Sequence, residues 1–156
     1  MAAKVPQPHL DAWRGLLNAH SAVLARVEQA LADAGLPPLS WYDVLRALRR
    51  APGRRLRMSE LAASLTISRG GLTKLADRLE AARALRREPC ATDRRGYDAV
   101  LTADGEKILR RMWPVYAAAL NESFVGALDE DEAAHVASAL ARLAEQARPG
   151  LAPAPT

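Results

Sequence analysis

The N-terminal part of this chain carries apolar residues at alternating spacings of three and four. The series is Leu10, Trp13, Leu17, His20, Leu24, Val27 and Leu31, in which His20 is the one polar member. Residues at these spacings lie on one side of a helix and form a heptad-like seam. The pattern therefore predicts a long helix with one apolar stripe for packing against another helix.

Turn-forming residues divide the next part of the chain. Gly35 and the prolines that follow it end the first helix, because glycine favours the C-terminal cap and proline cannot continue a helix. Ser40, with Asp43 three residues later, has the spacing of a capping box and predicts the start of a second helix. Pro52 and Gly53 end that helix, whose apolar residues are Trp41, Val44, Leu45 and Leu48.

Two short apolar faces follow, separated by a brief turn. The first consists of Leu61, Ala62 and Leu65, and the second of Leu72, Leu75, Ala76 and Leu79. Because only residues 66–68 separate the faces, two short helices must meet at a sharp angle, as in a helix-turn-helix. Residues 85–88 and 97–101 are of strand length and predict a two-stranded hairpin.

The C-terminal part of the chain predicts two more helices. Thr102 and Asp104 suit the start of a long helix, which we expect to run to about Leu128. Asp129 and Glu132 have the spacing that caps a last helix. The apolar residues that face one way on that helix are Val136, Leu140 and Leu143.

The order of these elements predicts a mainly α-helical protein with a small β-wing. A helix-turn-helix followed at once by a hairpin is a winged helix, whose second helix can enter the major groove of DNA while the hairpin lies along the neighbouring backbone or minor groove. Residues 40–102 would form this winged helix-turn-helix region, flanked by helices in 9–34 and 103–147. The tails, 1–8 and 148–156, are expected to be flexible, and the second is too rich in proline to pack.

Charge and composition add an anionic partner to this picture. The net charge of +4 and the sequence pI near 9.7 favour nucleic acid first and an acidic membrane surface second. No apolar run approaches the roughly 20 residues that span a bilayer, and the N-terminus lacks the apolar core of a signal peptide, so we expect a cytoplasmic protein without a membrane partner. The single cysteine, Cys90, excludes an intramolecular disulfide and a cysteine-clustered metal site.

The tip of the predicted hairpin concentrates charge in the sequence DRRG. Arg94 and Arg95 are placed to reach phosphates or a narrow minor groove, whose negative potential attracts arginine. A carboxylate facing phosphate would be repelled, so we expect Asp93 to pair with a neighbouring arginine and to stabilise the wing. The alternative is that these residues are ordinary solvated charges.

The run LAASLTISRGGLTKLADRLEAARALRREPCATDRRGYDAVLTADGEK resembles the winged-helix core of the MarR (multiple antibiotic resistance regulator) family. LADRLE matches the end of that family's recognition helix. DRRG followed by VLTADG matches its wing signature of Asp and Arg, an apolar strand that ends in Leu-Thr, and a glycine two residues beyond. The flanking helices also agree, so the resemblance extends over residues 9–147.

The resemblance implies a homodimeric, sequence-specific DNA-binding transcriptional regulator, usually a repressor. In such proteins the terminal helices build the dimer, here 9–34 with 103–147, and each subunit presents one recognition helix to a palindromic operator in double-stranded DNA. Two-fold symmetry would then place the half-sites about one helical turn apart. A small aromatic acid or phenol often relieves DNA binding. The expected dimer-interface residues are Leu10, Leu17, Leu24, Val136, Leu140 and Leu143.

The matched positions give a set of expected DNA contacts. Ser68 would cap the recognition helix, and Gly70 and Gly71 in its first turn would leave backbone N–H groups open to a phosphate. Side chains on its polar face would reach bases or adjacent phosphates. The full set is Ser68, Arg69, Gly70, Gly71, Thr73, Lys74, Arg78, Arg94 and Arg95. A further basic cluster is compatible with backbone contact or with a solvated face; it consists of Arg49, Arg50, Arg54, Arg55 and Arg57.

One position departs from the family's pattern. Members commonly have a glycine after the recognition helix, where the chain needs a left-handed residue, and this chain has Arg83 there. Either Arg83 tolerates the strain or the turn differs.

An effector site is a weaker inference from the aromatic residues outside the predicted helix-turn-helix and hairpin. Aromatic side chains with polar tips suit a pocket for a planar ligand, although core packing explains them equally well. His20 is able to hold a carboxylate or to respond to pH, and is otherwise an ordinary core or interface histidine. The candidate ligand-binding residues are Trp13, His20, Trp41, Tyr42, Trp113 and Tyr116.

Three alternatives remain open at this point. Cys90 could sense oxidants if Arg87 and Arg94 lower the pKa of its thiol, or be an incidental surface thiol. The protein could also be a basic winged-helix module that binds DNA without sequence preference or acts through protein contacts. Enzymatic activity has little support, because the three histidines lie in distant segments and no catalytic motif is present. We expect no cofactor and no metal site.

Overall fold

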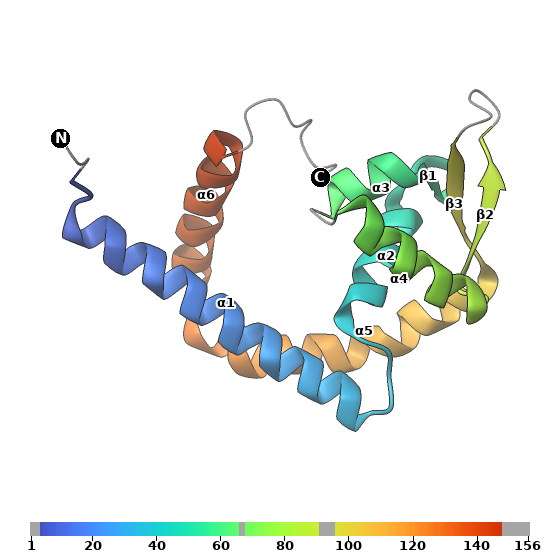
Figure 1. The fold of residues 1–156 in the computed structure, drawn as a ribbon. Helices are drawn as coiled ribbons and strands as arrows, with labels where there is room; N and C mark the ends of the chain where they lie inside the picture. The colour runs from blue at the N-terminus through green and yellow to red at the C-terminus, as the bar shows by residue number, and fades with distance from the viewer. Residues whose placement is uncertain (1–3, 66–67, 91–95, 148–156) are drawn as a thin grey trace.

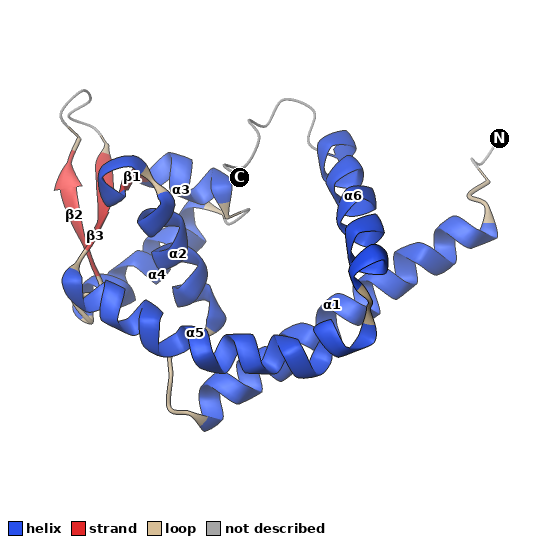
Figure 2. Ribbon diagram, turned by 180° about the vertical axis from the view of Figure 1, so that it is seen from behind, coloured by secondary structure: helices blue, strands red, loops and turns tan. Residues whose placement is uncertain are grey.

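The computed structural model describes residues 4–65, 68–90 and 96–147. These ranges contain six α-helices, two short 3₁₀ helices and three strands (Figures 1 and 2). Helices α2, α3 and α4 and the sheet gather at one end, which we call the reading region. Helix α1 runs beside α5, and α6 stands apart from the reading region (Figure 1). The predicted fold class is confirmed.

The first two helices meet at a turn that the sequence located correctly. Helix α1 (Gln7–Asp33) begins two residues ahead of the expected region, and Gly35 at φ +63° allows the Leu36 N–H to bond the Leu31 carbonyl at 2.9 Å. Helix α2 (Leu39–Arg50) starts one residue before Ser40, so the predicted Ser40–Asp43 capping box is wrong. The Leu39 N–H instead donates to both carboxylate oxygens of Glu28 on α1, each at 3.2 Å.

A three-stranded antiparallel sheet replaces the predicted two-stranded hairpin. Strands β2 (Leu85–Pro89) and β3 (Tyr97–Leu101) pair as expected, with Pro89 opposite Tyr97. The additional strand β1 (Arg55–Arg57) pairs with β3, giving the order β1-β3-β2. It follows the 3₁₀ helix η1 (Pro52–Arg54), where positive φ angles at Gly53 and Arg54 turn the chain toward β3.

Helix α5 (Ala103–Ser123) connects the sheet to the C-terminal part of the chain. Thr102 caps it as predicted, accepting from the Gly105 N–H at 3.0 Å. The helix ends at Ser123 and not near Leu128, and a 3₁₀ turn η2 (Val125–Ala127) follows. The Ser123 hydroxyl bonds the Ala119 carbonyl at 2.5 Å, a contact that competes with the helical ladder, and Gly126 is a poor helix former.

The buried core lies in the reading region and in the adjoining parts of α1 and α5. Helix α1 contributes Val27 and Leu31, and α5 contributes Leu109 and Met112. Helix α6 (Glu130–Ala147) begins as predicted, with Asp129 accepting from the Glu132 N–H at 2.8 Å, but buries no residue. Within the described ranges, no helix has the length and apolar character to cross a membrane.

Candidate DNA-binding site

Helices α3 (Met58–Ser64) and α4 (Arg69–Ala81) form the predicted helix-turn-helix. Ser68 caps α4 as expected, accepting from the Gly71 N–H at 3.1 Å. The turn residues 66 and 67 lie outside the described ranges. The inward face of α4 joins the core through Leu72, Leu75, Ala76 and Leu79.

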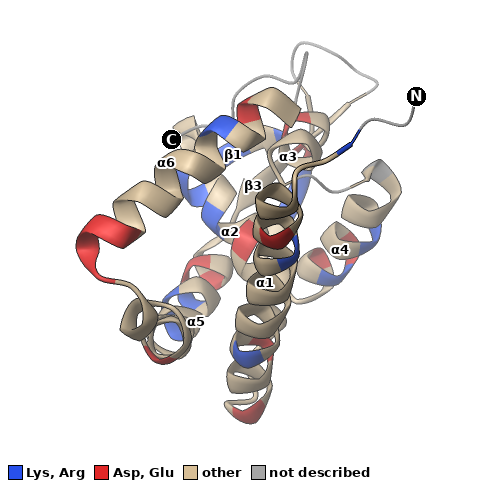
Figure 3. Ribbon diagram, turned by 90° about the vertical axis from the view of Figure 1, so that its left-hand side faces the viewer, with Lys and Arg blue, Asp and Glu red and all other residues tan. Residues whose placement is uncertain are grey.

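The outward face of α4 carries the side chains that the sequence assigned to DNA. Gly70, Gly71, Thr73, Lys74 and Arg78 are all exposed, and a Cβ added to Gly70 would meet no atom within 4 Å. Arg69 is the first residue of α4, but its side chain lies outside the described part. Figure 3 shows charged residues of both signs along this helix. Among the residues that the structure describes, the acidic side chains of α4 pair with Arg87 and leave Lys74 and Arg78 available to a ligand.

The structure describes the hairpin beside α4 up to Cys90 on one side and from Gly96 on the other. The Cys90 N–H bonds the Gly96 carbonyl at 3.0 Å, which closes the described part of the hairpin. The wing residues Asp93, Arg94 and Arg95 lie outside the described ranges, and their predicted roles stay predictions.

Acidic side chains engage most of the basic cluster that precedes the helix-turn-helix. Glu106 lies within 3.9 Å of Arg49 and 4.0 Å of Arg54, and Arg55 pairs with Glu88 of β2. The Arg57 Nη2 is 3.2 Å from the Cys90 sulfur. These contacts favour a structural role for the cluster over DNA contact, since they tie α5 to α2 and η1, and β1 to β2.

Cys90 is buried, so its interpretation as a surface thiol is wrong. Among the residues that the structure describes, the cation beside it is Arg57, on β1. Arg87, which the sequence placed near this thiol, points its guanidinium at Asp77 and Glu80 of α4. Whether the thiol responds to oxidants stays a prediction.

The turn between α4 and β2 keeps its shape without the glycine that is common in the family. Arg83 adopts φ +57°, so it occupies the left-handed conformation itself. The Thr102 hydroxyl donates to the carbonyls of this turn, 2.5 Å from the Arg83 oxygen and 3.0 Å from the Ala84 oxygen. The same residue caps α5, so one side chain joins the recognition helix, the sheet and the long helix.

Three of the six candidate ligand residues form one aromatic cluster. The ring of Tyr42 on α2 stacks on Trp113 of α5 with centroids 6.4 Å apart, and lies 4.8 Å from the ring of Tyr116. Burial raises the pKa of both tyrosine hydroxyls above 10.0. Trp41 is half-buried against the core, whereas Trp13 and His20 are exposed on α1 and stand outside the cluster.

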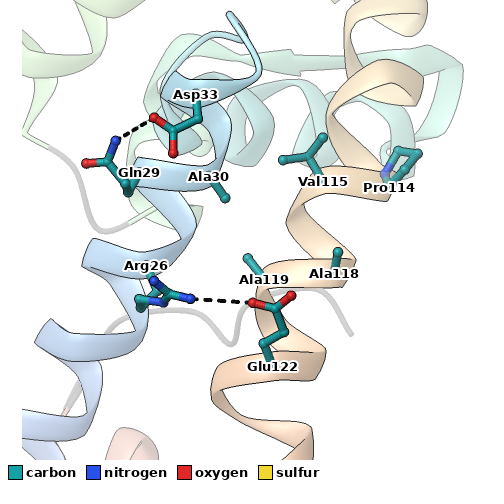
Figure 4. Close-up of a pocket in the computed structure, with 9 residues that line it drawn as sticks. All are labelled: Arg26, Gln29, Ala30, Asp33, Pro114, Val115, Ala118, Ala119 and Glu122. Atoms are coloured by element: carbon teal, nitrogen blue, oxygen red, sulfur yellow. Dashed lines mark hydrogen bonds and ion pairs between the residues drawn. The ribbon is translucent and has the colours of Figure 1, made fainter.

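A separate hollow lies between α1 and α5, and no sequence pattern pointed to it (Figure 4). Its volume is about 390 Å³. It is lined by small apolar residues of both helices and by charged side chains, among them Arg26 and Glu122, whose Nη2 and Oε2 atoms lie 3.4 Å apart. No group of three or more potential metal ligands occurs in the described ranges.

Comparison with known proteins agrees with this geometry. The model of the MarR family matches residues 34–96. The transcriptional regulator HosA of Escherichia coli O157:H7 is 33% identical over 120 residues, which are 76% of this chain and 82% of HosA. The crystal structure of Sco3205, a MarR family transcriptional regulator from Streptomyces coelicolor in complex with DNA, is 31% identical with a TM-score of 0.85, over 94% of this chain and 96% of that one.

A more distant solved structure shares the fold alone. It is that of BpsR from Bordetella bronchiseptica, whose DNA binding is regulated by 6-hydroxynicotinic acid. It is 22% identical, with a TM-score of 0.75 over 86% of this chain and 98% of BpsR.

Proposed function

Because this chain belongs to the MarR family of transcriptional regulators, we propose that it is a homodimeric repressor that binds a palindromic operator until a small aromatic or phenolic ligand releases it. The observation that carries the proposal is the exposed polar face of α4, capped at its N-terminus by Ser68 and backed by four buried apolar residues. This arrangement presents side chains and backbone N–H groups to one groove of DNA.

Each part of α4 has a distinct role in this proposal. Arg69, Thr73 and Lys74 contact bases or adjacent phosphates from the first two turns, and Arg78 contacts phosphate further along. Gly70 and Gly71 allow a phosphate to approach the helix N-terminus, where N–H groups are unpaired and the helix dipole is positive. Beyond the described hairpin, Arg94 and Arg95 would enter the minor groove, with Asp93 holding the loop.

The dimer would form through residues 9–34 and 103–147. Large apolar side chains remain exposed there in the single chain: Trp13, Leu17, Leu24, Phe124, Val125, Val136, Leu140 and Leu143. Leu10 is half-buried. Helix α6 has no Asp, Glu, Lys or Arg between Glu132 and Arg142, and three of its four acidic residues cluster at its start (Figure 3). A second copy would cover these surfaces, because contiguous apolar patches of this kind mark protein interfaces.

The Tyr42–Trp113–Tyr116 cluster is the proposed place for the effector. The cluster joins α2, in the reading region, to α5, in the proposed dimer segment 103–147. A planar ligand bound there would change the angle between these two helices. Trp41 packs against the core, and Trp13 and His20 would join the cluster only from a second subunit. The ligand would bind more tightly to a dimer whose two recognition helices are spaced wrongly for the operator. DNA affinity would fall by as much as the ligand prefers that state over the DNA-binding one.

The first test is selection of bound sequences from a random duplex pool at physiological salt. The proposal predicts one enriched palindrome with half-sites about one helical turn apart. Lys74→Ala and Arg94→Ala should weaken binding to it, whereas Arg142→Ala on α6 should not. Binding without enrichment would instead identify a basic module that ignores sequence, and the proposal would fail.

The effector is tested on the selected palindrome. 6-Hydroxynicotinic acid and a panel of benzoic acids and phenols should release the protein from it, and Tyr116→Leu should raise the ligand concentration for half-release. The same compounds at equal ionic strength should leave binding to an unrelated duplex unchanged. If no compound in the panel acts, the proposal of an aromatic effector at this cluster fails.

A further inference from the structure

Arg87, in the middle of β2, ties the sheet to the recognition helix. Its backbone N–H donates to the Glu80 Oε1 at 3.0 Å, and its Nε and Nη2 donate to the Glu80 Oε2 at 2.9 and 2.5 Å. Its Nη1 lies 2.8 Å from the Asp77 Oδ1. Asp77 and Glu80 are three residues apart and share one face of α4, so a single guanidinium fork holds both. We call these three residues the Arg87 clamp.

The clamp is charged at neutral pH. The hydrogen bonds from the Arg87 backbone and guanidinium hold the pKa of the Glu80 carboxyl below its ordinary value of 4.5. The hydrogen bond to the Glu80 carboxylate in turn raises the pKa of Arg87 above its ordinary value. The neighbouring Arg86 differs, because it pairs with Glu88 of its own strand and adds nothing between sheet and helix.

The clamp lies near the base of the hairpin, so it controls the direction in which the hairpin points. The covalent link from α4 to β2 is the short turn at Arg83, and the clamp is the next described tie along β2. Strands rise about 3.3 Å per residue, so the hairpin reaches about 10 Å beyond Arg87 by Cys90. A small rotation at the clamp therefore becomes a larger displacement at the outer end of the hairpin.

We propose that Arg87 is a positioning residue for DNA recognition, which fixes the angle between α4 and the β2–β3 hairpin so that both engage the same stretch of DNA. The proposal rests on the proposed function. Arg87 acts through this angle and not by touching DNA, since its guanidinium faces the carboxylates of α4. Without the clamp, a dimer could seat its recognition helices, but its hairpins would no longer engage the DNA at the same time.

The test compares full-length Arg87→Lys and Arg87→Ala with wild type on the selected palindrome. Arg87→Lys keeps the positive charge but removes the planar guanidinium that holds both carboxylates. We expect the affinity of this variant for the palindrome to fall roughly tenfold, with a larger fall for Arg87→Ala. Hydroxyl-radical protection should persist over the half-sites and disappear from the flanking segments. The salt slope should become shallower by about one unit for each phosphate that the variant no longer neutralises.

Arg86→Gln is the control for charge, because like Arg87→Ala it removes one positive charge from this strand, and it leaves the clamp intact. Its affinity should stay within about threefold of wild type, since exposed charges contribute little individually. All measurements are made well below the thermal midpoint of every variant. A role in stability alone would lower the midpoint but leave affinity and protection unchanged, and that result overturns the proposal. Uniform weakening of protection across half-sites and flanks also overturns it.

A measurement without DNA separates this proposal from the proposed function. Amide hydrogens of β2 and β3 should exchange faster in Arg87→Lys than in Arg86→Gln, while those of α1 are unaffected. Equal exchange in the two variants would show that the clamp does not fix the hairpin. If wild type selects no DNA sequence, the proposed function fails, and the exchange data alone decide whether the clamp holds.

Discussion

Gly105 shows how one missing side chain lets two parts of the molecule meet. A Cβ at this position would lie 2.0 Å from the Ala84 carbonyl oxygen and 2.8 Å from a methyl carbon of Leu101. The clash would be with backbone, which cannot move aside as a flexible side chain can. Gly105 therefore allows the first turn of α5 to pack directly on the turn that follows the recognition helix.

Gly105→Ala should destabilise the fold by about 3 kcal/mol, because the close contact forces α5 away from the Ala84 turn. Gly70→Ala is the stability control, since a Cβ there meets nothing and alanine is the better helix former; its change should stay within about 1 kcal/mol. Urea unfolding of both variants measures the difference. Similar midpoints for the two would contradict the steric argument.

Individual residues also show what could be predicted from the sequence. Ser68, Thr102 and Asp129 were correctly assigned as caps because capping depends on a partner two or three residues away. The same local chemistry failed at Ser40, where the acceptor for the Leu39 N–H is Glu28, eleven residues earlier on another helix. Local signals cannot reveal a partner supplied by tertiary structure.

At the scale of elements, the outward face of α4 was predictable and its tie to the sheet was not. Helical periodicity alone separates the buried row of leucines from the exposed polar row. The Arg87 clamp instead depends on how β2 lies against α4, although the spacing of Asp77 and Glu80 was a usable hint. Strand β1 was missed because three residues rich in arginine carry no apolar alternation.

The junction between α1 and α2 gives a prediction at this scale. Glu28→Ala should lower the free energy of unfolding by about 1 kcal/mol, because the N-terminus of α2 loses the acceptor that stands in for its cap. Glu122→Ala removes a carboxylate whose pair with Arg26 is exposed, and should change it by less than about 0.5 kcal/mol. Thermal or urea unfolding compares the two. An equal effect would mean that Glu28 is only another surface charge.

For the whole molecule, the main feature is the contrast between the reading region, which has a buried core, and helices α1 and α6, which expose apolar rows. The core residues of the reading region are nearly inaccessible, whereas α6 buries nothing in the single chain. A helix that buries no residue has no packing to stabilise it, and isolated helices of this length are marginal in water. We therefore expect α6 to need a partner surface to remain folded, and the exposed apolar rows of α1 and α6 are the surfaces proposed for that contact.

Leu140→Glu tests that dependence, because it places a charge in the middle of the exposed apolar row of α6. If the protein is the proposed dimer, the mass measured by sedimentation equilibrium should fall from twice the chain mass to that of one chain, 16.9 kDa, and helicity should decrease. Ala134→Glu adds the same charge to the opposite face of α6 and should keep the dimer mass. Operator binding should weaken with dimer loss, because one subunit reaches only one half-site. A Leu140→Glu variant that stays dimeric would show that the interface lies elsewhere, and would contradict the proposed role of the apolar row of α6 in dimerisation.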